Sequence, residues 1–492
     1  MKNKTLLSAS ILGLSLLYGC SSQPVVEYAN DTTLEPHQAA AIGAKPRVIV
    51  LTDAETDDRC SMVHFLLYTN DMQVDAIVQS NSCFQKKGWS SEPWLEEQLA
   101  AYEKVYPNLK VHDPNYPTAD ELRKVVFIGD ENPEHVNLPV SAPMIVPGME
   151  PVIDPTDWPD TPASDRIVEV LLEDDPRPVF IQAWGGGNTA VRAFDKLKKE
   201  YPDQYERAIN KAVLYCIWYQ DGAGSYIERN HPGVTILLNH HFSGSWDYGT
   251  MINSDNFVRQ YLHNGKNPLG AYYTQPYISE GDSPSFLYSI DNGLRSYEDP
   301  TYGGWGGRFY KVDGYDKIYR DTGFGELREW LETALHDFQA RLTWCITPEY
   351  DKANHKPVIT FPEGQDRTVH AGDSVTLKIG VEDKDKPDIE GFWKLYQQIW
   401  EQQGMTIEDV KKSVETPEGA AQFSAPSINW YQYQAGTYPG NIDLIYQPEG
   451  TSVKFVAPKV TAPQTIHIIV EVTDKGTPRL TSYARFIIRV EP

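Results

Sequence analysis

The chain has few cysteines, a deficit of positive charge, and neither an internal repeat nor a low-complexity tract. It contains 5 Cys in 492 residues, and because none of them forms a Cys-x-x-Cys pair, a zinc site is not expected. Its 44 Lys and Arg against 68 Asp and Glu give a net charge of −24. This sign argues against nucleic acid, whose phosphates need a basic surface, and against an anionic membrane surface. The length predicts two domains.

The N-terminal segment indicates the cellular location of the protein and is not expected to be part of the fold. A basic start precedes the apolar run Leu6 to Tyr18, which is too short to span a bilayer. The sequence Leu17-Tyr18-Gly19-Cys20 resembles a bacterial lipobox, which implies lipidation of Cys20. We therefore expect a lipoprotein signal peptide over 1–20, a polar tether over 21–45, and a location in the cell envelope, on the outer membrane. Ordinary signal-peptide cleavage is the alternative, because Tyr18 is bulkier than the residue usual there.

The cysteines beyond this segment allow two interpretations. An envelope location permits disulfides, but their pairing cannot be derived from the sequence. We favour buried free thiols for Cys60, Cys83, Cys216 and Cys345.

Residues 46–350 alternate between strand and helix patterns, which predicts an α/β fold with a mostly parallel sheet flanked by helices. The insertion between Phe84 and Pro162 is expected to form loops over the ligand-binding edge. The expected strands are Val48–Leu51, Val74–Ser80, Pro178–Ala183, Ala212–Ile217 and Thr235–Leu238, with helices at Cys60–Asn70, Ser164–Leu172 and Thr189–Glu200.

Residues 351–492 have a different character. Ser374–Val381, Thr465–Thr473 and Tyr483–Val490 have strand patterns separated by turn signals, which predicts an all-β sandwich. The segment Ile389–Gly404 is predicted to be a helical insertion.

An acidic turn follows the first predicted strand. Asp53, Glu55, Asp57 and Asp58 lie within six residues, so their charges repel. Such a cluster is most easily ionised around a hard cation, because calcium and magnesium prefer oxygen ligands. The carboxyl ends of strands are also where α/β sheets bind ligands. The alternative is a solvated turn, with Asp57 and Asp58 favouring the helix N-terminus.

Three further motifs occur at predicted strand or helix ends. Trp184-Gly185-Gly186-Gly187-Asn188-Thr189 contains glycines that permit close backbone approach to a ligand, although a plain strand-to-helix turn would look similar. Tyr219–Gly224 follows the strand that ends at Ile217. Glu280–Leu287 places a carboxylate before a helix start with a proline, which is also typical of an ordinary N-cap.

Together these motifs resemble the nucleoside-hydrolase superfamily, and most closely its bacterial branch of proteins named cellulose-binding, which have an immunoglobulin-like C-terminal sandwich. The resemblance covers nearly the whole mature chain. Its specific pieces are Thr52-Asp53…Asp57-Asp58…Ser61-Met62, Trp184–Asn188, Glu280-Gly281-Asp282…Pro284–Leu287, Gly303–Arg308, and Arg341…Trp344-Cys345…Asn354-His355.

The resemblance implies a Ca²⁺ site. Asp53, Asp58 and Asp282 would be its ligands, with Asp58 bidentate, and a backbone carbonyl of the glycine turn, that of Asn188, would add an oxygen. Asp57 would hydrogen-bond a sugar hydroxyl. This set suits calcium, which takes six to eight oxygens.

The chain also departs from that superfamily. Leu51 replaces an aspartate that begins the acidic motif, and Gly281 replaces a histidine that is the leaving-group acid in some members. Glu280 is the nearest substitute as an acid, and His240 or His241 is a second candidate.

The sequence thus predicts a calcium-dependent glycosidase acting on an oligosaccharide or other glycoside. Asp53 would accept a proton from the attacking water and Glu280 would protonate the leaving group. The expected substrate-binding residues are Asp57, Asn81, Asn188, Gln220, Asp221 and Trp305.

Two alternatives stay open. One is a carbohydrate-binding lipoprotein with a degenerate site, and the other is a true nucleoside hydrolase. In the first, sugar rings would stack on aromatic side chains, although burial in the core is the commoner fate of such residues. The candidates are Trp89, Trp94, Trp246, Trp305 and Trp430.

Overall fold

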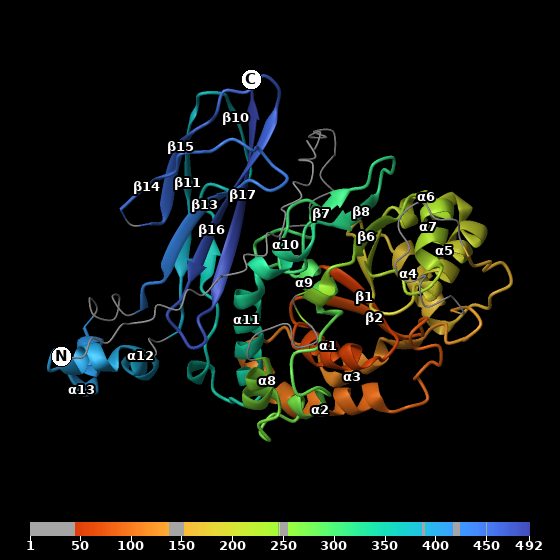
Figure 1. Cartoon of the computed structure of the whole chain (residues 1–492), viewed down its shortest axis with the longest axis horizontal. Coiled ribbons are helices and arrows are strands. Elements are labelled where there is room, and N and C mark those ends of the chain that lie inside the picture. Colours follow the sequence, from red (N-terminus) through yellow and green to blue (C-terminus); the bar gives the residue numbers. More distant parts are fainter. Residues whose placement is uncertain are drawn as a thin grey trace, which may run out of the picture.

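The computed structural model describes residues 45–136, 152–244, 246, 254–385, 389–416, 424–448 and 450–492. An α/β region, from strand β1 to helix α11, lies beside a C-terminal β region, from strand β9 to strand β17 (Figure 1). The expected signal peptide and tether lie outside the described residues, apart from Lys45. Among the described residues, no helix is long and apolar enough to cross a membrane.

An eight-stranded sheet forms the centre of the α/β region, in the order β3-β2-β1-β4-β5-β6-β8-β7. Every neighbouring pair is parallel except β7 with β8. The strands are β1 (Arg47–Thr52), β2 (Gln73–Gln79), β3 (Val126–Ile128), β4 (Val179–Ala183), β5 (Ala212–Ile217), β6 (Thr235–Asn239), β7 (Phe309–Lys311) and β8 (Ile318–Asp321).

Alternate residues of each central strand enter two separate hydrophobic cores. In β1, Val48 and Val50 face one core, while Ile49 and Leu51 face the other. Helices therefore cover both faces, as parallel sheets require. The first face packs on α1 (Thr56–Leu66), α2 (Trp94–His112), α9 (Ser283–Ser289) and α11 (Leu331–Trp344), and the second on α4 (Pro162–Leu172), α5 (Asn188–Glu200), α6 (Pro202–Ile209) and α7 (Ala223–Asn230).

The prediction of a mostly parallel sheet is confirmed, and all five expected strands form within two residues of their predicted bounds. The prediction that 84–162 forms loops is wrong for much of that segment. It contains α2, α3 (Ala119–Lys124) and β3, which extends the sheet beyond β2. The apolar residues of α2, such as Leu99 and Val105, are buried in the core, so packing rather than polar composition decides its structure. Residues 137–151 lie outside the described part.

The C-terminal β region is a sandwich, as expected. One sheet has the order β10-β17-β16-β13 and another β11-β15-β14, and they enclose an apolar core. The strands are β9 (Val358–Thr360), β10 (Arg367–His370), β11 (Ser374–Lys378), β12 (Gly380–Glu382), β13 (Ser427–Tyr433), β14 (Ile445–Tyr446), β15 (Ser452–Val456), β16 (Gln464–Thr473) and β17 (Thr481–Glu491).

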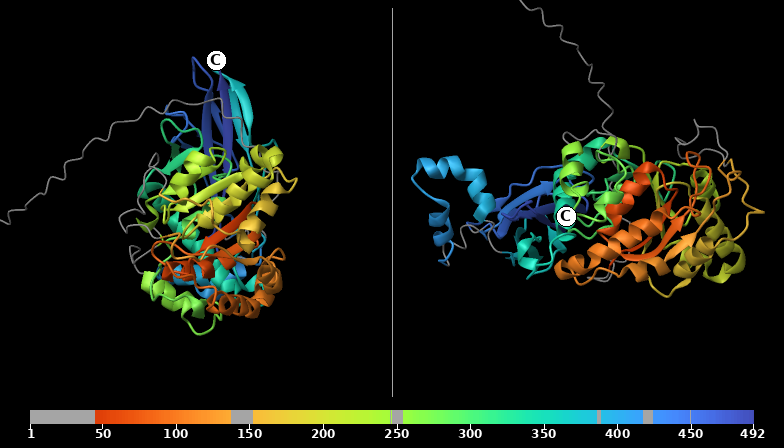
Figure 2. Two further views of the ribbon diagram at one scale, coloured as in Figure 1. Left: turned by 90° about the vertical axis from the view of Figure 1, so that its right-hand side faces the viewer. Right: turned by 90° about the horizontal axis from the view of Figure 1, so that it is seen from below.

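The helical insertion is also confirmed. Helix α12 (Ile389–Gln402) is followed by α13 (Ile407–Ser413), which the sequence pattern missed. The two helices lie on the side of the β region that faces away from the α/β region (Figures 1 and 2).

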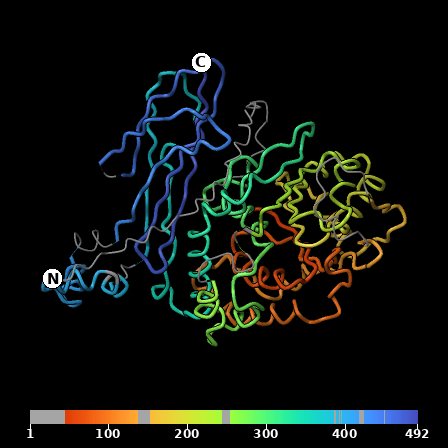
Figure 3. The backbone as a smooth tube through the Cα atoms, viewed as in Figure 1, coloured from red at the N-terminus to blue at the C-terminus, as the bar shows by residue number. Residues whose placement is uncertain are grey.

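The two regions share one hydrophobic core. Tyr433 and Tyr483 of the sandwich belong to the same buried cluster as α9 and α11. Arg485 on β17 is fully buried, and its guanidinium donates to the carbonyls of Leu294 (2.6 Å) and Gly303 (3.1 Å) in the α/β region. Figure 3 shows β16 and β17 running alongside α11. The sandwich is therefore packed onto the α/β region rather than held by a flexible linker.

The described cysteines are all free and buried. This confirms the interpretation of Cys60, Cys83, Cys216 and Cys345 as unpaired thiols.

Candidate functional site: an acidic cluster at the carboxyl edge of the sheet

Three carboxylates meet where β1 ends and α1 begins. Asp57 and Asp58 lie in the first turn of α1, and Asp282 is the N-cap residue of α9. One oxygen from each lies within 4.8 Å of the others, and all three residues are buried. The fold thus brings together side chains more than 220 positions apart in the sequence. We call Asp57, Asp58 and Asp282 the acidic trio.

Local hydrogen bonds fix the orientation of Asp58. Its Oδ1 accepts from the Thr52 hydroxyl (2.5 Å) and from the backbone N–H of Asp53 (3.1 Å). Ala54, between Asp53 and the helix, has a φ of 62°, which is unusual for a residue other than glycine. Such strained backbone is concentrated at functional sites.

The electrostatics of the trio favour a cation. Burial, followed by the charges of Asp53 and Asp57, raises the pKa of Asp58 well above its usual value. Burial and the neighbouring carboxylates do the same for the pKa of Asp282. Burial, followed by the charges of Asp53 and Asp57, raises the pKa of Glu55 to about 8. A divalent cation would reverse this repulsion, and oxygen ligands suit calcium or magnesium.

Five side-chain oxygens, one of the trio and four that follow the carboxyl ends of β1, β2, β4 and β5, are buried and accept no hydrogen bond from the described residues. Buried polar atoms in folded proteins almost always have a partner, so such a concentration indicates a ligand that supplies cation or donor groups. These atoms are Asp53 Oδ2, Asn81 Oδ1, Asn188 Oδ1, Gln220 Oε1 and Asp282 Oδ2.

The glycine turn after β4 connects these residues. A Cβ added at Gly185 would lie 2.7 Å from the Asp53 side chain, and one added at Gly186 would lie 2.5 Å from Asp221 Oδ2. The Gly186 N–H also donates to the Asn81 carbonyl (3.1 Å). Glycine is needed here because larger residues would displace the polar side chains from both sides.

Asn188 and Asp221 lie on the other side of this turn from Asp53. The Asn188 N–H donates to Asp221 Oδ2 (3.0 Å), and its side-chain amide donates to the His135 carbonyl (3.2 Å). Burial raises the pKa of Asp221 to about 6. Asn188 begins α5, so its carbonyl enters the helical hydrogen-bond ladder. The expected carbonyl ligand therefore fits poorly, and its side-chain oxygen is the better candidate for ligand contact.

The expected role of Glu280 as leaving-group acid does not fit the structure. Its side chain has 0% exposure. Its Oε1 accepts from the Tyr273 hydroxyl (2.8 Å), and its Oε2 contacts His64 Nδ1 (2.6 Å) and the Ser283 hydroxyl (2.7 Å). Both oxygens are thus engaged in the core, where Glu280 holds the segment that carries Asp282.

The structure also explains the departure at position 281. A Cβ added at Gly281 would lie 2.6 Å from Asp57 Oδ2 and 3.2 Å from the Phe242 ring. The Asp57 carboxylate and Phe242 occupy the space into which a longer side chain at position 281 would extend.

His240 and His241 follow β6, at the same edge of the sheet. Burial lowers the pKa of His240 to about 4, which makes it a poor acid near neutrality. His241 Nδ1 is hydrogen-bonded to Asp321 at the end of β8. In the sheet, β4, β5 and β6 separate β8 from β1, the strand that precedes Asp57 and Asp58.

The expected role of Trp305 in substrate binding does not fit well, because its ring packs in the hydrophobic core with Lys356 Nζ 5.7 Å from its centroid. Trp94, Trp246 and Trp430 are likewise buried, and only Trp89 of the five candidates is partly exposed. Sequence reasoning missed Phe242, which lies close to Asp57, and Trp218 and Phe84, whose rings follow on from it. Their positions after β2, β5 and β6, at the edge where such sheets bind ligands, were the sequence feature that could have identified them.

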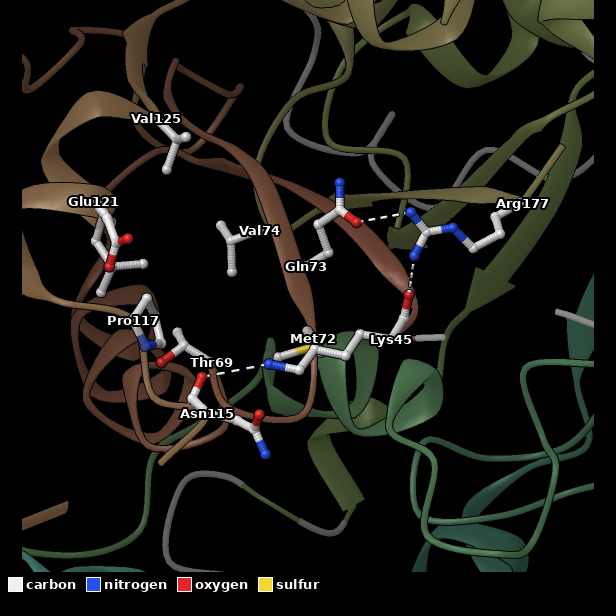
Figure 4. A pocket seen from close by; sticks show the side chains of 11 residues that line it. Lys45, Thr69, Met72, Gln73, Val74, Asn115, Pro117, Glu121, Val125 and Arg177 are labelled. Carbon is white, nitrogen blue, oxygen red and sulfur yellow. Dashed lines mark hydrogen bonds between the residues drawn. The ribbon is translucent and has the colours of Figure 1, made fainter. Parts of the chain in front are cut away.

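A cavity of about 420 Å³ lies away from this site. Its lining includes Lys45, Gln73 and Arg177, which precede or begin β1, β2 and β4 (Figure 4). Arg177 donates to Gln73 Oε1 (2.7 Å) and to the Lys45 carbonyl (2.7 Å). The cavity thus lies at the amino ends of the strands, opposite the acidic trio.

The parallel sheet with an acidic cluster at its carboxyl edge defines a nucleoside-hydrolase-like protein with an appended sandwich. Residues 47–309 match the family described as cellulose-binding Sde182, nucleoside hydrolase-like domain, and residues 424–490 match the C-terminal domain of cellulose-binding protein Sde0182. The chain belongs to this family of cellulose-binding, nucleoside-hydrolase-like proteins.

A solved structure supports the assignment over nearly the whole length. It is a nucleoside hydrolase-related hypothetical protein from Saccharophagus degradans that is associated with carbohydrate metabolism. It is 25% identical, with a TM-score of 0.72, and the match covers 91% of this chain and 100% of that chain. The effector XOO4466 and the effector XopQ in complex with adenosine diphosphate ribose are each 11% identical, with TM-scores of 0.34 and 0.35 over 62% of this chain and 95% of theirs. No curated protein matches the chain.

Proposed function

We propose that the chain is a calcium-dependent hydrolase of N- or O-glycosidic bonds that acts on carbohydrate accessible at the cell envelope. The observation that carries this proposal is the acidic trio together with the five buried, unpartnered oxygens at the same edge of the sheet. Sugar hydroxyls are donors and calcium is bound by oxygens, so together they would satisfy this set.

The residues present fit calcium. Asp57, Asp58 and Asp282 supply three carboxylate oxygens that lie within 4.8 Å of one another. When bound, calcium would supply positive charge that orients adjacent sugar hydroxyls and favours deprotonation of a water.

Asp53 is the proposed base. Its Oδ2 is buried and unpartnered, so it can accept the proton of a water that attacks the anomeric carbon. Asn81, Asn188 and Gln220 would accept hydrogen bonds from sugar hydroxyls. A single attack by water through an oxocarbenium-like transition state inverts the anomeric centre.

We assign no residue to protonation of the leaving group, because Glu280 is bound on both oxygens within the core. This gap favours the second candidate, a carbohydrate-binding protein without catalysis, which also agrees with the family's name.

We further propose that Cys20 is lipidated and that the protein is anchored to an envelope membrane. The proposal rests on the sequence 17–20 alone. Loss of labelled fatty acid in Cys20→Ser would support it, and retention would contradict it.

The experiment is a hydrolysis screen with cello-oligosaccharides, aryl furanosides, inosine and uridine, with calcium or with a chelator. We expect calcium-dependent release of a reducing sugar, with the inverted anomer first in NMR spectra, and loss of release in Asp53→Asn but not in the exposed control Asp203→Asn. Binding of a saccharide without cleavage would favour the second candidate. Free base from inosine or uridine would identify a nucleoside hydrolase.

A further inference from the structure

Three aromatic rings form a continuous surface at the carboxyl edge of the sheet, which we call the aromatic wall. Phe84 follows β2, Trp218 directly follows β5, and Phe242 follows β6. The Phe84 and Trp218 ring centroids are 6.4 Å apart, and those of Trp218 and Phe242 are 5.1 Å apart with an interplanar angle of 75°. Phe84 is 39% exposed, so the wall reaches the surface.

The wall begins beside the acidic trio. The Cβ position of Gly281 lies 3.2 Å from the Phe242 ring and 2.6 Å from Asp57 Oδ2. Ring and carboxylate flank one point, so they are at most about 6 Å apart. The next ring of a molecule held at the trio is therefore within reach of the wall.

The backbone of Trp218 is held in an unfavourable conformation. Its φ is 59°, in the left-handed region that bulky residues rarely adopt. The Trp218 N–H donates to the Asn239 carbonyl (3.1 Å), and the indole Nε1 donates to the His240 carbonyl (3.3 Å). These bonds fix the ring at the edge, although it is only partly buried. With Ala54 at the acidic turn, two strained residues flank the same site.

Polar groups adjoin the wall. Gln220, two residues after Trp218, presents the unpartnered Oε1. The backbone carbonyl of Gln220 accepts from the N–H of Cys83 (2.9 Å), which ties the loop of Phe84 to that of Trp218. An apolar surface beside a few placed hydrogen-bond acceptors is typical of a ligand site.

We propose that Trp218 is a substrate-positioning residue whose ring, with Phe84 and Phe242, binds the second ring of a two-ring substrate. The proposal rests on the proposed function, because the first ring is the sugar held at the acidic trio. The shared chemistry is a ring with an apolar face and hydrogen-bond donors. A pyranose and a nucleobase both present such a face, and the test separates them.

The test compares one-ring and two-ring probes on the full chain with calcium. NMR titration gives the affinities of methyl β-glucoside, cellobiose, ribose and adenosine. We expect the second ring to raise affinity in the wild type and this gain to fall about tenfold in Trp218→Asn. Asparagine adopts the left-handed region readily, so this variant should fold. Trp218→Phe keeps a ring and should keep most of the gain.

Two controls make the result specific. Trp393→Ala removes a partly buried indole on α12, away from the site, and should leave all affinities unchanged. Calcium affinity, measured separately, should be unchanged in Trp218→Asn, so a failure of the calcium site is recognised independently of the wall. A gain confined to cellobiose identifies a saccharide, and one confined to adenosine a nucleoside.

The proposal is overturned if neither second ring raises affinity in the wild type, or if Trp218→Asn retains the full gain. It is also overturned if Trp218→Asn weakens calcium binding as strongly as it weakens the two-ring probes, since Trp218 would then support the frame of the site rather than the second ring.

Discussion

Asp58 and Asp337 are both buried aspartates, yet their surroundings displace their pKa values in opposite directions. Around Asp337 on α11, Tyr68, Arg341 and Lys356 approach within 2.9 Å. Although burial alone would raise the pKa of Asp337, the charges of Lys356 and Arg341 lower it. We call these four residues, with Asp71, the α11 cluster.

At the acidic trio the same residue type has carboxylates for neighbours, and burial and repulsion raise the pKa of Asp58 and Asp282. A buried charge without a countercharge is costly. The α11 cluster contains its own countercharges, which fits a structural role, whereas the neighbours that raise the pKa of Asp58 and Asp282 are carboxylates, which favours a bound cation. The charged groups next to each buried aspartate therefore distinguish the two sites: cationic side chains surround Asp337, and carboxylates surround Asp58 and Asp282.

The largest effect should come from breaking the α11 cluster. Arg341→Met would leave Asp337 and Asp71 without their buried partner and lower the free energy of unfolding by about 3–5 kcal/mol. Denaturant unfolding measures this. The control Arg123→Met removes a surface residue with three carboxylate partners, and its effect should stay below about 1 kcal/mol. Equal effects would contradict the distinction drawn here.

Calcium should stabilise the trio but not the α11 cluster. At a free concentration of about 100 times its dissociation constant, it should add about 2.7 kcal/mol to the free energy of unfolding. Asp282→Asn should abolish the gain, while Arg123→Met should keep it. A gain that survives in Asp282→Asn would place the cation elsewhere.

The two regions should respond oppositely to pH. The raised pKa values of Asp221 (about 6) and Glu55 (about 8) mean that the folded state binds their protons more tightly. Without calcium, this contribution is present below pH 4 and is lost as the pH rises to 8. The contribution of Asp337 is present above pH 4 and is lost as the pH falls below it.

Thermal unfolding between pH 2 and pH 8 tests both expectations. Calcium affinity should rise over the same range, because carboxylate ligands must be deprotonated. An affinity that falls as the pH rises would count against carboxylate ligands.

The smallest expected effect is a gain in stability. Asp58→Asn removes a repelled charge but keeps an Oδ1 that can accept from Thr52 and Asp53. Without calcium, this variant should unfold at higher denaturant, with a gain of about 1 kcal/mol, while the matched Asp337→Asn should lose stability. A loss in Asp58→Asn would show that its charge is compensated in the absence of metal.

The sequence predicts the central strands because their apolar runs are buried on both faces. It predicts the acidic residues because four carboxylates at one strand end have few purely structural explanations. It does not predict α2 and β3, whose structure depends on tertiary packing, or the short strands β7 and β8. The roles expected of Glu280 and Trp305 fit the structure poorly for one reason. Burial and orientation are set by residues distant in sequence, such as His64 and Tyr273 for Glu280.

Trp218 is the opposite case, a candidate site residue that the sequence does not identify. Its position after β5 is visible in the sequence, but its left-handed φ and its contacts with Phe84 and Phe242 depend on three separate loops. An aromatic residue is usually buried in the core, so only the fold distinguishes this one.

The most direct test of the account is a calorimetric calcium titration of the wild type and Asp58→Ala, with Asp203→Ala as a control. The account predicts binding of one equivalent in the wild type and in the control, and its loss in Asp58→Ala. Absence of binding in the folded wild type, or undiminished binding in Asp58→Ala, would contradict the assignment of the acidic trio as a calcium site.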